Sequence, residues 1–180
     1  MRVLVTAASR HGATAELATE IGARLRETRA SERSADTSIE VDVRPVDAVE
    51  GIDGYDAVVL GSAVYLGQWL DAARDWAAAH AEELSQRPVW LFSSGPVGAP
   101  LKPDESHVVD ISSIAAALSP VEHRVFPGKI DRLELGFAER AVVRALRVPE
   151  GDFRDWVAVR DWAAQIAEHL SARESAVATA

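Results

Sequence analysis

The chain has 180 residues, 48% of them hydrophobic, and its 28 acidic residues outnumber 19 Lys and Arg to give a formal net charge of -9. This length suits one domain with a sizeable core, and an acidic chain without a basic block argues against nucleic acid as a partner. Because the chain has no cysteine, disulfides, thiolate metal sites and a cysteine nucleophile are excluded.

The first elements in chain order are a strand, a helix and a second strand. Residues 2–8 are apolar enough for a buried strand, and residues 13–27 carry apolar side chains at helical spacing. Residues 28–38 are polar and have no period, which predicts a loop. The alternation of apolar and polar residues over 38–46 then predicts a half-exposed edge strand.

The middle of the chain repeats this alternation of strands and helices. Continuous apolar runs that end in small residues are typical of central parallel strands. The pattern predicts, in order, a strand at 57–60, a helix at 69–84, a strand at 89–92, a helix at 111–118 and a last strand at 123–128.

Two further helices are predicted after the last strand. Residues 135–148 have the spacing of an amphipathic helix, and residues 153–170 have that of a final helix. No linker or repeat divides the chain, so we expect one domain over residues 1–172 and a frayed end at 173–180.

Five strands that alternate with helices predict a doubly wound α/β fold with a parallel sheet. In such a sheet, ligands bind beyond the carboxyl ends of the strands, near the point where the strand order reverses. Three of the predicted strand ends are rich in small and hydroxyl-bearing residues, at 6–14, 61–67 and 93–98. We expect these three segments to form one binding crevice.

The first of these segments has the features of a phosphate site. Ser9, Gly12 and Thr14 lie where a strand is followed by a helix, and the backbone N–H groups at a helix start are unpaired. The helix dipole also favours an anion at this place. The alternative is ordinary capping by Ser or Thr, which is common at helix starts.

The same segment resembles the phosphate loop of the flavodoxin family. The stretch TAASRHGATAELA, residues 6–18, has Ala7 in place of the usual aromatic residue and matches the family pattern at Ser9, Gly12, Thr14 and Ala18. The resemblance implies a flavodoxin-like three-layer sandwich whose five-stranded parallel sheet has the order 2-1-3-4-5, with an added helical segment after the fifth strand. It also implies FMN as the cofactor.

A second stretch is similar to one branch of that family. Residues 55–69, YDAVVLGSAVYLGQW, look like the corresponding loop of the menaquinone-dependent protoporphyrinogen oxidase branch. That branch also has an added segment after the fifth strand, here residues 129–154, and a final helix opened by an Asp-Trp pair, here Asp161 and Trp162. The resemblance implies transfer of electrons or hydride to or from a quinone or a porphyrinogen.

The resemblance implies three groups of cofactor-binding residues. The phosphate is expected on Ser9, Arg10, His11, Gly12, Ala13 and Thr14. One face of the flavin ring is expected along Ser62, Ala63, Val64, Tyr65, Leu66 and Gly67, and the opposite side along Ser93, Ser94, Gly95, Pro96, Val97 and Gly98. Each assignment has an alternative without a ligand. Tyr65 would then be a loop residue exposed to water, Trp69 a core residue of the next helix, and 93–98 a plain surface turn.

The added helix at 135–148 has two interpretations. It is either a rim beside the flavin that docks a substrate, a partner or a membrane surface, or a peripheral helix that closes the sheet. The acidic residues and arginines interleaved over 131–155 are expected to form a solvated face.

The expected function is that of an FMN-dependent oxidoreductase, protoporphyrinogen oxidase-like or quinone reductase-like, with a redox donor and a redox acceptor as partners. We expect no catalytic side chain, because the cofactor carries the redox chemistry, and no metal, because the five histidines lack ligand spacing. The alternative is a binding module or electron carrier without substrate chemistry of its own. A receiver-type signalling domain fails, because the first strand ends in Thr6 and Ala7 rather than in acids.

The sequence also bears on where the protein works. The N-terminal apolar run is too short for a signal peptide, and no stretch approaches the roughly 20 apolar residues of a membrane-spanning helix. We expect a cytoplasmic protein, and the sequence leaves peripheral membrane contact and the oligomeric state open.

Overall fold

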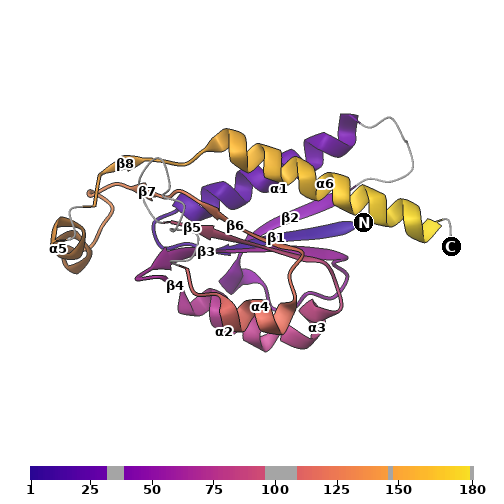
Figure 1. Ribbon diagram of the computed structural model, residues 1–180, viewed down its shortest axis with the longest axis horizontal. Coiled ribbons are helices and arrows are strands. Elements are labelled where there is room, and N and C mark those ends of the chain that lie inside the picture. The colour runs from indigo at the N-terminus through magenta and orange to yellow at the C-terminus, as the bar shows by residue number, and fades with distance from the viewer. Residues whose placement is uncertain (32–38, 96–108, 146–147, 179–180) are drawn as a thin grey trace.

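The computed structural model describes residues 1–31, 39–95, 109–145 and 148–178, and its centre is a parallel sheet between two layers of helices (Figure 1). Five strands lie in the order β2-β1-β3-β5-β6, and each neighbouring pair is parallel. The strands are β1 (Arg2–Ala8), β2 (Glu40–Pro45), β3 (Ala57–Tyr65), β5 (Val89–Ser94) and β6 (Glu122–Phe126). This arrangement confirms the expected flavodoxin-like order of the five parallel strands.

The central strand β3 is longer than the sequence pattern predicts. The apolar run ends at Leu60, but β3 continues to Tyr65 and then turns back into the short strand β4 (Gln68–Trp69), which pairs with it antiparallel. Gly61 therefore lies inside the strand and not at its exit. It stands beside Phe92 of β5, and a Cβ atom at Gly61 would overlap the Phe92 ring. The glycine is needed because the aromatic ring occupies the space above it.

Two helical layers cover the sheet. Helices α1 (Ala13–Ser31) and α6 (Trp156–Ala178) pack on one face, and the core there includes Leu17, Ile21, Phe92 and Trp162. The other face is covered by α2 (Asp71–Ala79), α3 (Ala81–Ser85) and α4 (Ser112–Leu118), with the short 3-10 helix η1 (Val46–Ala48) beside them. Since both faces are covered, β1, β3 and β5 are buried over almost their whole length, as parallel strands require.

The single helix predicted at 69–84 is wrong, because the chain forms two helices there, α2 and α3. They are separated by His80, whose backbone has φ −108° and ψ 15°. The His80 ring lies 4.6 Å from the Trp76 indole, and its Nδ1 atom lies 2.9 Å from the Trp76 carbonyl oxygen. The backbone N–H of His80 still donates to the Trp76 carbonyl at 3.1 Å, so the break lies in the backbone conformation of His80, which the spacing of apolar residues does not reveal.

Helix α6 begins at a different Asp-Trp pair from the one expected. The pair that opens it is Asp155-Trp156, while Asp161-Trp162 lies inside the helix. The Asp155 carboxylate accepts hydrogen bonds from the backbone N–H groups of Val157 at 3.1 Å and Ala158 at 3.0 Å. These two bonds satisfy donors that a helix start leaves unpaired, so Asp155 decides where α6 begins.

The end of α6 also extends past the predicted helix. It continues to Ala178, so most of the segment that was expected to fray is helical. Within the described ranges, no helix is both long and apolar enough to cross a membrane.

The added segment leaves the sheet after β6 and returns before α6. Its ends are joined by an antiparallel pair, β7 (Lys129–Ile130) with β8 (Gly151–Asp152), and between them lies α5 (Phe137–Ala145). Figure 1 shows α5 standing away from the sheet, on the side where the parallel strands end. The segment therefore lies at the edge where the three polar loops meet.

Candidate cofactor site

The loop between β1 and α1 places a buried hydroxyl beside the start of a helix. Gly12 has a φ of +81°, a left-handed conformation that favours glycine, and its carbonyl accepts the N–H of Glu16 to open α1. Thr14 in the first turn is only 2% exposed. The hydroxyl oxygen of Ser9 is buried and has no hydrogen-bond partner. A buried hydroxyl without a partner is uncommon, and this one stands next to a helix start, where an anion is favoured.

The second loop is a tight turn at the tip of β3. Leu66 and Gly67 both have positive φ, 50° and 78°, and they connect β3 to β4 as a two-residue hairpin. The turn leaves Leu66 89% exposed. The Arg10 guanidinium lies 5.4 Å from the centre of the Tyr65 ring, so the first and second loops are in contact.

The third loop begins at the end of β5. Ser94 is 7% exposed, and Gly95, with a φ of +120°, donates its N–H to the Phe126 carbonyl at 2.9 Å. Pro96, Val97 and Gly98, which the resemblance also assigns to the cofactor, lie outside the described residues.

The three loops meet in one cavity of about 700 Å³, within the usual range for ligand pockets. The predicted site residues that line it are Ser9, Arg10, His11, Ala13, Thr14, Ala63, Val64, Tyr65, Leu66, Gly67, Ser94 and Gly95. Gly12, Ser62 and Ser93 are not among its lining residues. The convergence that the sequence predicts is therefore present, although not every predicted residue reaches the cavity.

Ser62 and Ser93 have structural partners instead. The Ser62 hydroxyl donates to the Ala63 carbonyl at 2.9 Å and accepts the N–H of Leu70 at 3.0 Å. The Ser93 hydroxyl oxygen accepts the indole N–H of Trp69 at 2.7 Å. Both serines and Trp69 are buried, so Trp69 is a core residue and the two hydroxyls hold the strand ends together beneath the cavity.

Ser93 also contacts His123, a residue for which the sequence predicts no role. The Nε2 atom of His123 lies 2.8 Å from the Ser93 hydroxyl oxygen. Since that oxygen already accepts from Trp69, its own proton is available to His123, which favours a neutral imidazole. Burial lowers the pKa of His123, and the charge of the adjacent Glu122 opposes this only in part.

This lowered pKa predicts a loss of stability in weak acid. The unfolded chain takes up the His123 proton near the ordinary pKa of 6.5, while the folded chain takes it up only at lower pH. The unfolded state therefore binds more protons between these two pKa values, and the free energy of unfolding falls as the pH falls through that window. Urea unfolding at a series of pH values is expected to show a steeper decline for the wild type than for His123→Gln. Identical profiles would contradict the role given to His123.

The added segment forms a wall of the cavity, and the individual residues of this wall were not predicted from the sequence. Val109 and Gly128 line the cavity, as do the following residues of the segment: Lys129, Ile130, Asp131, Glu134, Leu135, Ala138, Glu139, Val143 and Val148. The added helix therefore lies at the edge of the cavity, and its role in docking a substrate, a partner or a membrane surface stays a prediction. In the sequence, the amphipathic spacing was the signal that could have pointed to this wall. It shows that α5 has an apolar side, but it does not show what that side faces.

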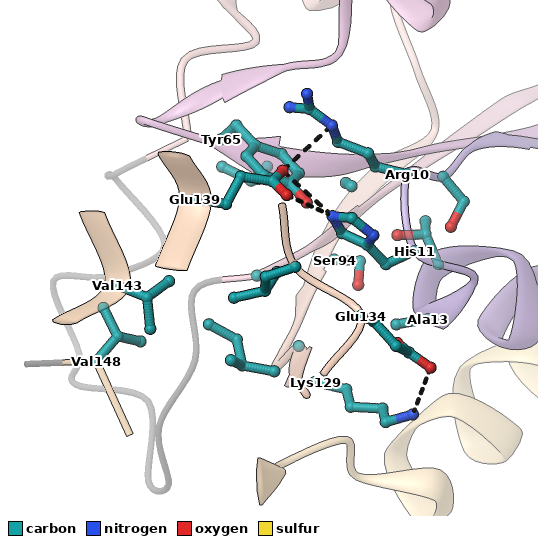
Figure 2. A pocket seen from close by; sticks show the side chains of 18 of the residues that line it. Arg10, His11, Ala13, Tyr65, Ser94, Lys129, Glu134, Glu139, Val143 and Val148 are labelled. Carbon is teal, nitrogen blue, oxygen red and sulfur yellow. Dashed lines mark hydrogen bonds and ion pairs between the residues drawn. The ribbon is translucent and has the colours of Figure 1, made fainter. Parts of the chain in front are cut away.

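One carboxylate of α5 reaches the phosphate loop. Figure 2 shows Glu139 pointing at Arg10 and His11, and both of its oxygens lie 3.2 Å from Nε2 of His11. The Nε atom of Arg10 is also 3.2 Å away. The backbone N–H of Gly136, at 2.8 Å, holds the pKa of Glu139 below its ordinary value, and His11 and Arg10 add to the effect. The interleaved charges of the segment are therefore not a uniformly solvated face.

The same cluster affects Tyr65. Burial raises the pKa of the Tyr65 phenol, the neighbouring Glu139 carboxylate raises it further, and Arg10 opposes both. The phenol is therefore protonated at neutral pH and is available as a hydrogen-bond donor at the cavity wall. Among the residues that the structure describes, no group of three or more His, Cys, Asp or Glu side chains is placed to hold a metal ion.

The base of the added segment is fixed to α1. The Arg154 guanidinium, only 4% exposed, donates to Glu16 at 2.7 Å and to the carbonyl of Ala13 at 3.2 Å. It also pairs with Asp152 of β8 at 2.6 Å. These bonds hold the end of the segment beside the first turn of α1, next to the phosphate loop.

Comparisons with known proteins agree with this geometry. A family model described as a flavodoxin domain matches residues 4–156. A flavodoxin from the domain Archaea superposes with a TM-score of 0.61 over 95% of this chain and 99% of its own, at 16% identity. Oxidised flavodoxin 1 from Bacillus cereus superposes with a TM-score of 0.59 over 94% of this chain and 99% of its own, also at 16% identity.

More distant solved structures include enzymes. An azoreductase from Bacillus anthracis has a TM-score of 0.55 over 93% of this chain and 98% of its own, at 11% identity. At such identities the likeness is one of fold. A comparison with curated proteins finds no match.

Proposed function

The chain belongs to the flavodoxin domain family, and from this premise we propose that it is an FMN-binding oxidoreductase that transfers electrons or hydride at an exposed edge of the flavin ring. When bound, FMN supplies the redox chemistry, and the protein supplies binding, orientation and electrostatics. The observation that carries the proposal is the cavity itself, in which the ends of β1, β3 and β5 meet at the edge of one parallel sheet.

The residues of the first loop fit a phosphate. The orphaned hydroxyl of Ser9 gains a partner when a phosphate oxygen accepts its proton, and Thr14 lines the same cavity. The start of α1 adds unpaired backbone N–H groups and the positive end of a helix dipole. Ser9, Thr14 and the backbone of residues 10–14 would therefore hold the phosphate of FMN.

The second and third loops would hold the ring. Tyr65 and the backbone of Leu66 and Gly67 would lie along one side, and Ser94 with Gly95 along the other. An aromatic side chain stacks well on a flat ring, worth roughly 0.5 to 1.5 kcal/mol beyond burial. The positive φ at Gly95 lets the backbone approach the ligand without a side chain in between.

The added segment would shape the substrate side. Its lining residues Ile130, Leu135, Ala138, Val143 and Val148 are apolar, and Lys129 is the cation among them. The same wall carries the carboxylates of Asp131, Glu134 and Glu139, and Lys129 lies 3.9 Å from Glu134. A largely apolar molecule such as a quinone, or the macrocycle of a porphyrinogen, would lie against the apolar side chains. Membership of the protoporphyrinogen oxidase branch is part of this proposal.

The test begins with binding. Titration of the purified chain with FMN is expected to quench the flavin fluorescence and to give a yellow protein after removal of free ligand. A chain that stays colourless, without quenching, would contradict the flavoprotein assignment. The loaded protein is then mixed anaerobically with a porphyrinogen as electron donor and, separately, after chemical reduction, with a quinone as acceptor, while the visible absorbance is followed. Binding of FMN without acceleration of either reaction favours an electron carrier.

A further inference from the structure

Helix α5 has few ties to the rest of the domain. Of its described side chains, Phe137 is 93% exposed, and Arg140 and Arg144 are exposed as well. None of its described side chains belongs to the two core clusters on the faces of the sheet. The helix is also short, and a helix of its length is not stable by itself in water. Its position over the cavity therefore depends on specific contacts.

Among the described residues, the polar contacts that join α5 to the loops of the sheet are those of Glu139 with Arg10 and His11. The remaining polar contacts of α5 stay within the added segment, for example the bond from Arg140 to the Leu135 carbonyl at 2.9 Å. By contrast, the base of the segment is held by the β7–β8 pair and by Arg154. The segment thus has a fixed base, and the described polar contacts that join its helix to the loops of the sheet all pass through one carboxylate.

The partners of that carboxylate belong to the phosphate loop. Arg10 and His11 follow directly after Ser9, whose buried hydroxyl has no partner. A phosphate held by this loop would carry up to two negative charges, and it would lie within a few residues of the guanidinium and the imidazole that Glu139 contacts. Two anions cannot share these donors without cost, because like charges at short range repel each other.

We propose that Glu139 is a latch that competes with the ligand phosphate for Arg10 and His11, so that α5 closes over the cavity while the phosphate seat holds no anion and is released when it is filled. The proposal rests on the proposed function, because it names the phosphate of that ligand as the trigger. By linkage the effect is reciprocal: the phosphate weakens the latch, and the latch weakens phosphate binding.

The variant that isolates the latch is Glu139→Gln. Glu139 also accepts the backbone N–H of Gly136, the residue before α5, and this hydrogen bond caps the helix. A Gln side chain at position 139 can accept the same bond. The substitution therefore removes the charge and keeps the cap. Glu168→Gln removes the same charge from the exposed face of α6 and serves as the matched control.

The measurement is the ratio of dissociation constants for riboflavin and FMN at low ionic strength, because these ligands differ only in the phosphate. We expect Glu139→Gln to raise this ratio by roughly threefold to tenfold, and Glu168→Gln to leave it unchanged. The gain is expected to shrink in 0.5 M salt, since screening weakens the competition. An unchanged or lower ratio for Glu139→Gln, or an equal rise in the control, overturns the latch while leaving the proposed function intact.

A second measurement needs no flavin. Trypsin cleavage after Arg140 and Arg144, followed by mass spectrometry, reports the opening of α5. We expect faster cleavage in Glu139→Gln than in the wild type, and inorganic phosphate is expected to accelerate cleavage in the wild type alone. Equal rates in all cases overturn the latch. If the wild type binds neither flavin, the proposed function fails, and the proteolysis result still decides whether Glu139 holds the helix.

Discussion

The double substitution Ser9→Ala with Thr14→Ala is expected to raise the dissociation constant of FMN by roughly 100-fold to 10,000-fold. Each hydroxyl is assigned one hydrogen bond to the phosphate, and a bond with one charged partner is worth about 1.5 to 3 kcal/mol. Riboflavin, which has no phosphate, is expected to bind the variant about as well as it binds the wild type. Fluorescence titration with both ligands measures the two constants.

The same substitution is expected to leave the fold intact. The Ser9 hydroxyl has no partner within the described chain, so its removal deletes no internal hydrogen bond. Thr19→Ala is the matched control, because Thr19 lies in the same helix and its hydroxyl donates to the Ala15 carbonyl at 2.9 Å, away from the cavity. If the double variant binds FMN as tightly as the control does, the phosphate loop has been misassigned.

The largest expected loss of stability follows from Trp162→Ala. Trp162 is 0% exposed, and its ring lies 6.2 Å from that of Phe92 and 5.6 Å from that of Phe126. Its indole N–H donates to the Glu122 carboxylate at 2.7 Å. Removing a buried tryptophan leaves a cavity between α6 and the sheet, so the free energy of unfolding is expected to fall by about 3 to 5 kcal/mol.

Trp162→Phe separates the contribution of ring packing from that of the hydrogen bond to Glu122. Phenylalanine keeps most of the packing against Phe92 and Phe126 but cannot donate to Glu122, so a loss of about 1 to 2 kcal/mol is expected. Urea unfolding followed by circular dichroism gives both values, provided that the dependence on urea stays the same in all three proteins. A loss below about 1 kcal/mol for Trp162→Ala would show that the aromatic cluster is not what holds α6 to the sheet.

The sequence pattern predicted the sheet because the signals for it are local. A continuous apolar run such as residues 57–60 is buried wherever it occurs in a parallel sheet, and the edge strand shows the alternation of one exposed face. Once five such strands alternate with helices, their carboxyl ends lie at one edge of the sheet. The convergence of the Ser- and Gly-rich loops followed from this, and the cavity confirms it.

Element boundaries were predicted less well because they depend on single contacts. The break between α2 and α3 lies in the backbone conformation of the single residue His80, and the start of α6 comes from the Asp155 cap. Two Asp-Trp pairs occur within a few residues, and the spacing of apolar residues does not distinguish them. The hydrogen bonds of the first turn make that choice.

The difference between what local sequence signals predict and what depends on tertiary contacts is clearest at the candidate cofactor site. The sequence by itself determined the strands and their grouping, because burial of apolar side chains follows a short-range period. The phosphate role of the first loop stays a prediction. Only the tertiary structure placed Ser62 and Ser93 inside strands instead of loops, because β3 ends five residues beyond its apolar run and β5 continues to Ser94. There both hydroxyls bond to neighbouring residues and do not line the cavity. Only the tertiary structure brought Glu139 to His11, 128 residues away, because an ion pair between distant residues depends on how the whole segment folds back and leaves no period in the sequence.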